Sequence, residues 1–170
     1  MNSNKLIIKI VLLSFIVISL AYCTANKITN NDLKIYNNID LSLVNENNWE
    51  VSNDILYYIN QHRIKIKKKI LTKDTLHATA CAVMHTKYMI EEVRVCHDYF
   101  FSRSDALKKI GATRVSENVA YGYTSAESVV NAWLKSEAHR IVIEGDYSNI
   151  GFGVLKSPNN NYYYTTLFFK

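Results

Sequence analysis

The sequence predicts an α+β domain with a mainly antiparallel sheet that helices cover on both faces. Near the C-terminus, Ile150–Leu155 and Tyr162–Phe169 are rich in strand-forming residues, and the polar segment 156–160 between them has the residues of a hairpin loop. Upstream, apolar residues recur at helical spacing, so helices alternate with strands along the chain. A length of 170 residues suits one domain with a sizeable core.

The first helix is expected close to Trp49, where order begins. Ser52 or Asn53 can cap it, and the basic run Lys65–Lys69 ends it. Its apolar side is a single stripe formed by Ile55, Leu56 and Ile59.

A second helix is expected from its cap, Asp74, to about Glu92. Apolar residues at four-residue spacing predict its buried face: Leu76, Ala80, Met84 and Tyr88. Cys81 lies within this helix, and Cys96 follows it. About eleven helical residues after Cys81 carry the chain some 16 Å away, at about 1.5 Å per residue. A disulfide needs Cα atoms closer than about 7 Å, so we expect two unpaired, buried thiols.

The C-terminal half supplies the remaining elements. A short helix, Asp105–Ile110, ends at Gly111, and an alternating pattern predicts a strand over Glu117–Tyr123. A third helix follows the capping residue Ser125. Its inward side is expected to contain Val129, Val130, Trp133 and Leu134. Glu137–Ile143 is a further short helix before the hairpin.

The first 25 residues have the features of a secretory signal peptide. Lys5 and Lys9 precede the apolar run 10–22, and Ala21 and Ala25 are candidate cleavage positions. The run is shorter than the roughly 20 apolar residues of a membrane span. A lipid anchor at Cys23 is the alternative, although a tyrosine precedes this cysteine where bacterial lipoproteins have a small residue.

The chain therefore divides into three parts. Residues 1–25 are the expected signal peptide, residues 26–48 an Asn-rich flexible lead-in, and residues 49–170 the folded domain. Such a leader predicts export, which would place the mature protein in the periplasm, at the cell surface or in the medium.

The charge of the chain is modestly basic. Its formal value is +5, and removal of the signal peptide takes away Lys5 and Lys9 and leaves +3. The densest basic cluster is Lys65, Lys67, Lys68 and Lys69. It could attract an anionic membrane or wall polymer, but such a run is more often a solvated loop or helix end. No basic stripe interleaved with aromatic residues indicates binding to nucleic acid.

Two histidines and a glutamate stand beside predicted element boundaries: His97, Glu117 and His139. Imidazole and carboxylate are ligands of zinc and similar divalent ions, and the same groups can transfer protons near neutral pH. Their spacing alone has little specificity. His77, Cys81 and His85 lie four residues apart on one helix and could also hold a metal, but such a stripe more often faces the core.

Six segments between Ile55 and Phe169 occur in a recognisable order: ILYYINQHR, LHATACAVMHTKYM, CHDYFFSR, ENVAYGYTSAESVVNAWLKSEAHR, YSNIGFGV and YYTTLFF. In this order and spacing they resemble bacterial members of the CAP superfamily. These are secreted proteins related to the cysteine-rich secretory proteins, antigen 5 and the plant pathogenesis-related proteins. The resemblance implies a three-layer αβα sandwich with a surface cleft.

The same resemblance implies which residues form the cleft. His97, Glu117 and His139 match the cleft residues of relatives and are the expected metal ligands, with zinc as the candidate ion. Many eukaryotic relatives have a second glutamate where this chain has Ser136. Glu137 could supply that carboxylate or face solvent, and solvent is favoured. We count Ser136 and Glu137 with the cleft, whereas the residue that matches His85 lies outside it in relatives.

Three functions remain open. The first is a secreted binding module whose cleft holds a divalent metal or a small lipid-like ligand, with membrane lipid or a host or cell-envelope component as partner. The second is a metal-dependent extracellular hydrolase or peptidase, but Ser104, Ser125 and Ser128 lack the Gly-x-Ser-x-Gly turn of a serine hydrolase. The third is a scaffold with a vestigial cleft. The sequence favours the binding module over the enzyme.

Overall fold

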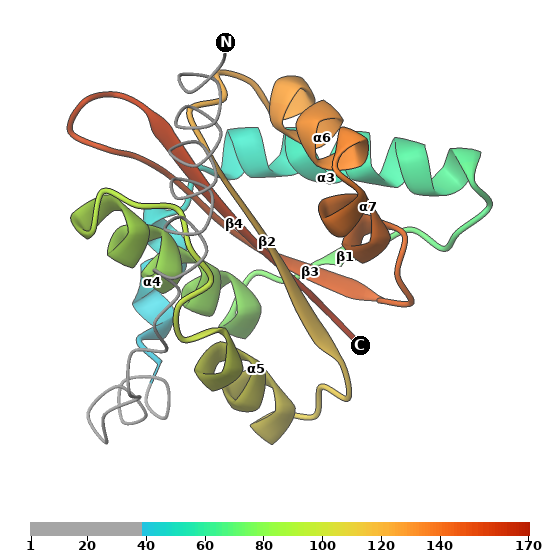
Figure 1. Ribbon diagram of the computed structural model, residues 1–170. Coiled ribbons are helices and arrows are strands. Elements are labelled where there is room, and N and C mark those ends of the chain that lie inside the picture. Colours follow the sequence, from blue (N-terminus) through green and yellow to red (C-terminus); the bar gives the residue numbers. More distant parts are fainter. Residues whose placement is uncertain (1–38) are drawn as a thin grey trace, which may run out of the picture.

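The computed structural model describes residues 39–170, which form three layers (Figure 1). A four-stranded sheet with the order β1-β3-β4-β2 is the middle layer. Helices α4 and α5 lie on one face of it, and α3, α6 and α7 lie on the other. This arrangement confirms the predicted α+β class and the αβα sandwich with a mainly antiparallel sheet.

Helices and strands alternate along the chain, as predicted. In order they are the 3-10 helix η1 (Leu41–Glu46), α3 (Trp49–Lys65), β1 (Thr72–Lys73), α4 (His77–Glu91), α5 (Phe100–Lys109), β2 (Val115–Tyr121), α6 (Ala126–Lys135), α7 (Glu137–Ile143), β3 (Asn149–Lys156) and β4 (Tyr162–Phe169). The predicted bounds of α7 and β4 agree with the structure, and β3 extends one residue further at each end.

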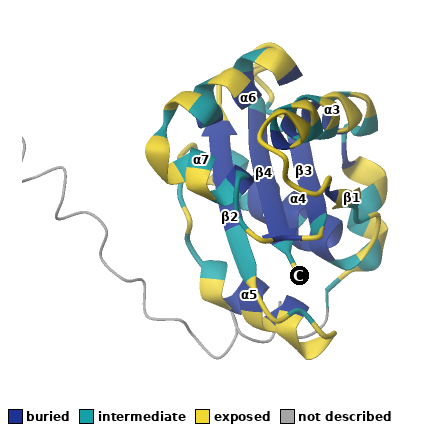
Figure 2. Ribbon diagram, turned by 90° about the vertical axis from the view of Figure 1, so that its right-hand side faces the viewer, coloured by how far each residue is buried: buried dark blue, intermediate teal, exposed yellow. Residues whose placement is uncertain are grey.

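Strand β4 is the centre of the sheet. It pairs antiparallel with both β2 and β3, whereas the two-residue β1 adds to β3 in parallel. All residues of β4 between its first and last are buried, because helices cover both faces (Figure 2). Continuous burial is the pattern of an inner strand, and it explains the unbroken apolar and threonine run near the C-terminus.

Helix α4 packs directly against the backbone of β3 because two glycines leave room for it. A Cβ atom at Gly151 would lie 2.5 Å from the carbonyl carbon of Ala78, and one at Gly153 would lie 2.3 Å from the carbonyl oxygen of Ala82. In the same contact, the Thr86 hydroxyl donates to the carbonyl oxygen of Gly153 at 3.0 Å. The distance between helix and sheet is thus set by small side chains on both.

This close packing makes the predicted buried stripe of α4 wrong in part. Ala80 is buried as expected, but Leu76 is 43% exposed, and Met84 and Tyr88 are only half-buried. The buried face consists instead of Ala78, Thr79, Ala80, Cys81, Ala82, Val83, His85, Thr86 and Met89. The spacing of large apolar residues did not predict the buried face of α4, because only small side chains fit where the helix contacts the β3 backbone.

The opposite face of the sheet carries the core of α3 and α6. Val129, Val130 and Trp133 are buried and Leu134 packs against their cluster, which confirms the predicted inward side of α6. The Trp133 indole Nε1 donates to the carbonyl oxygen of Val119 on β2 at 3.2 Å, so α6 is tied to the sheet. Ser125 caps α6 through a reciprocal hydrogen-bond pair with Ser128, as expected for a capping serine.

Two helices begin earlier than predicted. Helix α3 begins at Trp49, directly after its cap Asn48, whose side chain accepts the Val51 amide. Helix α5 begins at Phe100 rather than Asp105. In both cases the first turn contains bulky aromatic residues. Their helix preference is weak, so the sequence gives no clear signal that the helix begins there.

Helix α4 begins at His77, later than expected from the predicted cap Asp74, and its N-cap residue is Leu76. The Asp74 side chain nevertheless accepts the amides of Leu76 and Thr79, at 3.1 and 3.0 Å, and so satisfies a donor of the first turn. Cys81 and Cys96 are unpaired, as predicted. Cys81 is buried, and burial raises the pKa of its thiol to about 12, whereas Cys96 is half-buried rather than buried.

The folded region begins before Trp49. Helix η1 packs against α4, and the side-chain oxygen of Asn47 accepts the Val154 amide at 2.9 Å. Residues 41–48 therefore belong to the folded region, although they were expected in the lead-in. The expected signal peptide, residues 1–25, and its alternative lipid anchor at Cys23 lie outside the described residues. Between residues 39 and 170, no helix combines the length and apolarity needed to cross a membrane.

Gly153→Ala should lower the free energy of unfolding by about 3 kcal/mol, because the new Cβ would overlap the α4 backbone at Ala82. Urea unfolding measures this change. Asn161→Ala, at an exposed position in the β3–β4 hairpin, is the control and should stay within about 0.5 kcal/mol of the wild type. Equal unfolding midpoints for the two variants would show that α4 does not pack as closely as described.

Candidate functional site

Strand β2 lies at an edge of the sheet and carries Glu117 and Asn118 side by side. Successive side chains of a strand point to opposite faces, so the two residues contact different helical layers. Glu117 contacts Arg103 of α5, whereas the Asn118 side-chain amide donates to the carbonyl oxygen of His139 on α7 at 3.1 Å. One edge strand thus holds groups from both helical layers.

The Glu117 carboxylate forms a buried ion pair with Arg103. The guanidinium Nε donates to Oε2 at 2.7 Å and Nη2 donates to Oε1 at 2.8 Å. The two side chains are 0% and 1% exposed. The remaining guanidinium nitrogen, Nη1, donates to the carbonyl oxygen of Asp98 at 2.7 Å. Such two-point contact is the strongest geometry open to an arginine and a carboxylate.

His97 lies at the outer side of this ion pair. Its Nδ1 is 2.9 Å from Oε1 of Glu117, and 53% of its side chain is exposed. An ionised carboxylate only accepts hydrogen bonds, so Nδ1 carries the proton and Nε2 is the free acceptor of the neutral ring. No residue between 39 and 170 forms a hydrogen bond with Nε2 of His97.

His85 supports the loop that carries His97. It is fully buried, its Nε2 lies 2.8 Å from the carbonyl oxygen of Cys96, and its ring is 4.0 Å from Oε1 of Glu117. Burial, and then the charge of Arg103, lower the pKa of His85 to about 4, so the ring is neutral at neutral pH and the contact with Glu117 is not an ion pair. His85 was expected outside the cleft, and its full burial keeps it off the cleft surface, behind the Glu117 carboxylate.

The same loop is held by a second set of contacts. Asp98 accepts hydrogen bonds from Arg94 at 2.5 Å and from the Tyr88 hydroxyl at 3.0 Å. Val93 and Tyr99 have positive φ angles of 49° and 59°. A β-branched residue rarely adopts this conformation, so the contacts of Asp98 and His85 hold the loop in a shape that its own backbone does not favour.

His139 approaches from the opposite helical layer. Its Nδ1 is 2.7 Å from the hydroxyl oxygen of Ser136, the residue that precedes α7. Burial, and then the charge of His97, lower the pKa of His139. A positive charge on His97 thus disfavours protonation of His139.

Glu117 is ionised throughout the physiological pH range. Burial disfavours its charged form, but the charge of Arg103 and the hydrogen bond from His97 outweigh burial and lower the pKa of Glu117 to about 2. A carboxylate this acidic is a weak base, because its negative charge is already well stabilised.

The residues expected in the cleft were His97, Glu117, Ser136, Glu137 and His139. The structure brings the first two into direct contact and pairs Ser136 with His139, whereas Glu137 is exposed. Sequence reasoning missed Arg103 and Asn118. Asn118 is a polar residue in the buried segment ENVA, and that mismatch was the available signal, whereas CHDYFFSR is mostly exposed or half-buried and gave no such signal for Arg103.

The donor atoms fit a site of two histidines better than one with three protein ligands. Nε2 of His97 and Nε2 of His139 have no hydrogen-bond partner among the described residues, whereas both oxygens of Glu117 are engaged by Arg103. Within residues 39–170, no group of three or more His, Cys, Asp or Glu side chains is arranged to hold a metal ion. This includes the trio of His77, Cys81 and His85.

Sequence comparison identifies relatives over most of the described region. The family model described as the cysteine-rich secretory protein family, CAP, matches residues 56–169. The chain is also 38% identical over 58 residues to the uncharacterized membrane protein YlbC of Bacillus subtilis, a match that covers 34% of this chain and 15% of that protein. The chain thus spans a small part of the curated relative.

Solved structures share the fold. An outer surface protein from Borrelia burgdorferi is 25% identical with a TM-score of 0.64, and the match covers 71% of this chain and 92% of that one. An extracellular protein with an SCP domain from Bacillus anthracis is 24% identical with a TM-score of 0.60, over 69% of this chain and 39% of that one. A cysteine-rich secretory protein from Staphylococcus aureus is 18% identical with a TM-score of 0.61, over 73% and 39%.

Replacement of Arg103 by Met should destabilise the protein by about 3–5 kcal/mol, because it leaves the buried Glu117 carboxylate without its counter-charge. Urea unfolding measures the change. The double variant Arg103→Met/Glu117→Gln removes both charges and should recover part of the loss. If the two single changes were simply additive, the ion pair would not couple α5 to β2.

Stability should fall by about 2 kcal/mol between pH 7 and pH 5, because the folded-state pKa of His85 lies near 4 while that of the unfolded chain is near 6.5. A group with a lowered folded pKa stabilises the protein above its unfolded pKa, and this stabilisation is lost as pH falls toward the folded value. Unfolding curves from pH 7 to pH 5 test this. His85→Gln should flatten the dependence and His77→Gln should preserve it; the reverse result would assign the effect to another histidine.

Proposed function

Because the chain belongs to the cysteine-rich secretory protein (CAP) family, we propose that it is an extracellular binding module whose cleft at His97, Glu117 and His139 takes up a divalent metal ion such as zinc. The location is supported by the N-terminal segment, which has the pattern of a secretory signal. It is also supported by two relatives that are named as an outer surface protein and an extracellular protein.

One observation carries the metal proposal. His97 and His139 each have Nδ1 fixed by a neighbouring oxygen, and each leaves Nε2 without a partner among residues 39–170. Metal-binding histidines commonly have this arrangement, in which a second group orients the ring and sets its tautomer. Two imidazoles are fewer than the three or four protein ligands of a usual zinc site, so we expect weak binding completed by solvent or by a partner molecule.

Glu117 acts in this proposal through His97 rather than as a ligand. Its carboxylate is saturated by Arg103 and turned away from solvent, with 1% of the side chain exposed. We therefore propose that Glu117 orients His97, in place of the ligand role expected from the sequence. The same ion pair makes Glu117 a poor general base, which favours binding over the alternative of metal-dependent hydrolysis.

A small lipid-like ligand is the second occupant that we propose for the same surface. The chain on either side of His97 exposes large apolar side chains, with Val93 80%, Val95 42% and Phe101 74% exposed. Exposed apolar residues grouped beside a polar site often mark a binding surface. Displacement of a fluorescent fatty acid, compared between wild type and Phe101→Ser, tests this occupant.

Calorimetric titration with zinc at pH 7 should give a binding signal that His97→Ala and His139→Ala each abolish. Protons compete with metal for the imidazole nitrogens, so affinity should fall at pH 5. His62→Ala is the matched control: His62, on α3, pairs with Glu144 after α7 at 2.9 Å and with none of the cleft residues, so its loss should leave zinc binding unchanged.

Glu117→Gln should weaken zinc binding less than loss of either histidine, because Glu117 only orients His97. Absence of heat with the wild-type protein would eliminate the metal proposal. A loss in Glu117→Gln as complete as in His97→Ala, in protein shown to be folded by circular dichroism, would instead restore Glu117 as a ligand.

A further inference from the structure

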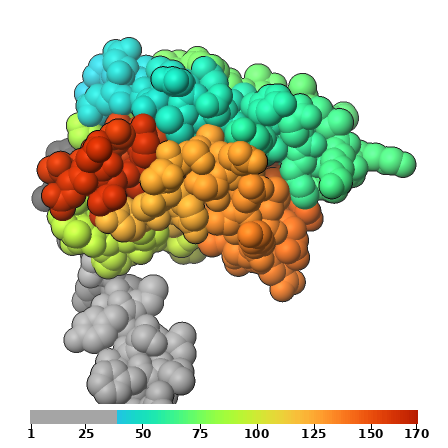
Figure 3. All heavy atoms as spheres, turned by 90° about the horizontal axis from the view of Figure 1, so that it is seen from above, coloured from blue at the N-terminus to red at the C-terminus, as the bar shows by residue number. Residues whose placement is uncertain are grey.

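The segment Ile64–Ile70, with the sequence IKIKKKI, forms a basic and apolar surface at the C-terminal end of α3. Its four lysines are exposed: Lys65, Lys67, Lys68 and Lys69. Its three isoleucines are also exposed, with Ile64 54%, Ile66 36% and Ile70 58% accessible. We call this segment the basic loop. It projects from the molecule as the green tip in Figure 3.

The lysines of the basic loop form no ion pair within the described structure. In residues 39–170, no carboxylate lies within ion-pair distance of any of the four ammonium groups. Lysines that serve only solubility are commonly interspersed with acidic residues, which reduces the local potential. A dense, uncompensated cluster produces a positive potential that attracts anions.

The loop is held in one conformation by its backbone. The amides of Lys67 and Lys68 donate to the carbonyl oxygens of Ile64 and Arg63, at 2.9 and 2.8 Å, which is the hydrogen-bond pattern of a Schellman helix end. Lys67 occupies the left-handed position of this motif with a φ of 59°, where glycine is the usual residue. Lysine is less favourable than glycine in this conformation, but it places a positive charge at the tip of the loop.

Arg63 fixes the base of the loop to the segment between α7 and β3. It is 2% exposed and donates to the carbonyl oxygens of Lys69, Ile143, Gly145 and Tyr147. All four acceptors are neutral, so the positive charge of Arg63 is solvated by dipoles and is not cancelled by a bound carboxylate.

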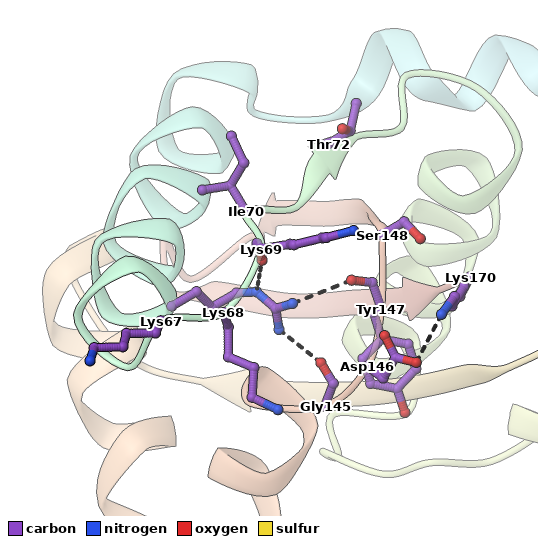
Figure 4. Close-up of a pocket in the computed structure, with 11 residues that line it drawn as sticks. Lys67, Lys68, Lys69, Ile70, Thr72, Gly145, Asp146, Tyr147, Ser148 and Lys170 are labelled. Atoms are coloured by element: carbon purple, nitrogen blue, oxygen red, sulfur yellow. Dashed lines mark hydrogen bonds and ion pairs between the residues drawn. The ribbon is translucent and has the colours of Figure 1, made fainter.

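A cavity of about 470 Å³ lies between the basic loop and the segment 145–148 (Figure 4). Five basic side chains line it, against one carboxylate: Arg63, Lys67, Lys68, Lys69 and Lys170, with Asp146. The single carboxylate is engaged, since Lys170 Nζ lies 2.8 Å from its Oδ2. In Figure 4, Lys69 extends toward Ser148 and Lys68 toward Gly145, while the ammonium group of Lys67 extends away from these two.

We propose that the basic loop docks on a membrane surface that contains anionic phospholipid, with a phosphate headgroup in the Arg63–Lys69 cavity and the loop isoleucines in the interface. The cavity offers positive charge and N–H donors, which suit a phosphate. A soluble anion would use the lysines alone. The three exposed isoleucines have a role only where an apolar phase lies beside the charge, and that combination is characteristic of interfacial membrane binding.

This membrane site is separate from the proposed metal site. None of the cavity residues belongs to the cleft of His97, Glu117 and His139. Failure of zinc binding therefore leaves the membrane proposal intact, and the two can be tested in the same preparations.

Vesicle sedimentation tests the proposal with phosphatidylcholine vesicles, with or without 30 mol% phosphatidylglycerol. Every variant has the same N-terminal residues 1–38. Vesicles of phosphatidylcholine alone measure how much these residues contribute to binding. Wild-type protein should bind the anionic vesicles at low salt and be released as salt screens the surface charge. Lys68→Ala/Lys69→Ala should weaken binding by about 25-fold, since each lysine near an anionic surface contributes about fivefold.

Three further variants make the test specific. Lys108→Ala/Lys135→Ala removes two charges elsewhere and should leave binding within about twofold. Lys67→Gly should weaken binding about fivefold without lowering the unfolding temperature, because glycine is favoured at this left-handed position. Ile64→Ser/Ile70→Ser keeps all charges and should reduce binding only if the loop enters the interface.

Equal losses from the two lysine pairs would overturn the proposal, because they would show a response to net charge alone. Unchanged binding in Ile64→Ser/Ile70→Ser, together with full competition by millimolar inorganic phosphate, would assign the cavity to a soluble anion instead. Retained zinc binding in Lys68→Ala/Lys69→Ala, and retained vesicle binding in His97→Ala, would confirm that the two sites are independent.

Discussion

The buried ion pair between Arg103 and Glu117 is the interaction on which the cleft depends. Burying both charges away from water costs free energy. This cost is offset by hydrogen bonds, because every guanidinium nitrogen has an acceptor and the carboxylate accepts two bonds from Arg103. The pair fixes the first turns of α5 against edge strand β2. It also positions the buried Oε1 of Glu117 to accept the hydrogen bond from His97. The orientation of an exposed imidazole is thus set by an arginine that never reaches the surface.

The position of this pair follows from the packing of the sheet. Gly151 and Gly153 allow α4 to contact the β3 backbone, which brings the buried His85 of α4 beside Glu117 and against the loop before α5. On the other face, Asn118 holds α7 through the carbonyl oxygen of His139. One strand thus anchors both histidine-bearing segments, the loop before α5 through Glu117 and helix α7 through Asn118, although they lie in different layers.

Local patterns predicted those parts of the structure that local interactions determine. The hairpin, α7 and the capped α6 each carry their own signal, in strand-forming residues, length and a capping serine, and each was confirmed. The face of α4 could not be predicted, because its small residues are selected by glycines of β3 more than sixty positions away. Likewise, CHDYFFSR identified His97 but not the importance of Arg103, since the partner of that arginine is fourteen residues away on a strand. Pairing of a buried charge depends on tertiary packing, which periodicity does not reveal.

Helix α7 is one connection between the two proposed sites, and the contact of the cavity residue Tyr147 with Ser116 on β2 is another. The anchoring of α7 argues for their independence. The carbonyl oxygen of His139 in α7 accepts the Asn118 amide, and that of Ile143, its last residue, accepts the Arg63 guanidinium. Coupling between sites needs an element with two alternative arrangements that both ligands bias. A seven-residue helix held at its third and last residues by buried donors has little freedom to shift. Substitutions at the cleft and at the basic loop should therefore be additive, and each surface can be assigned from its own variants.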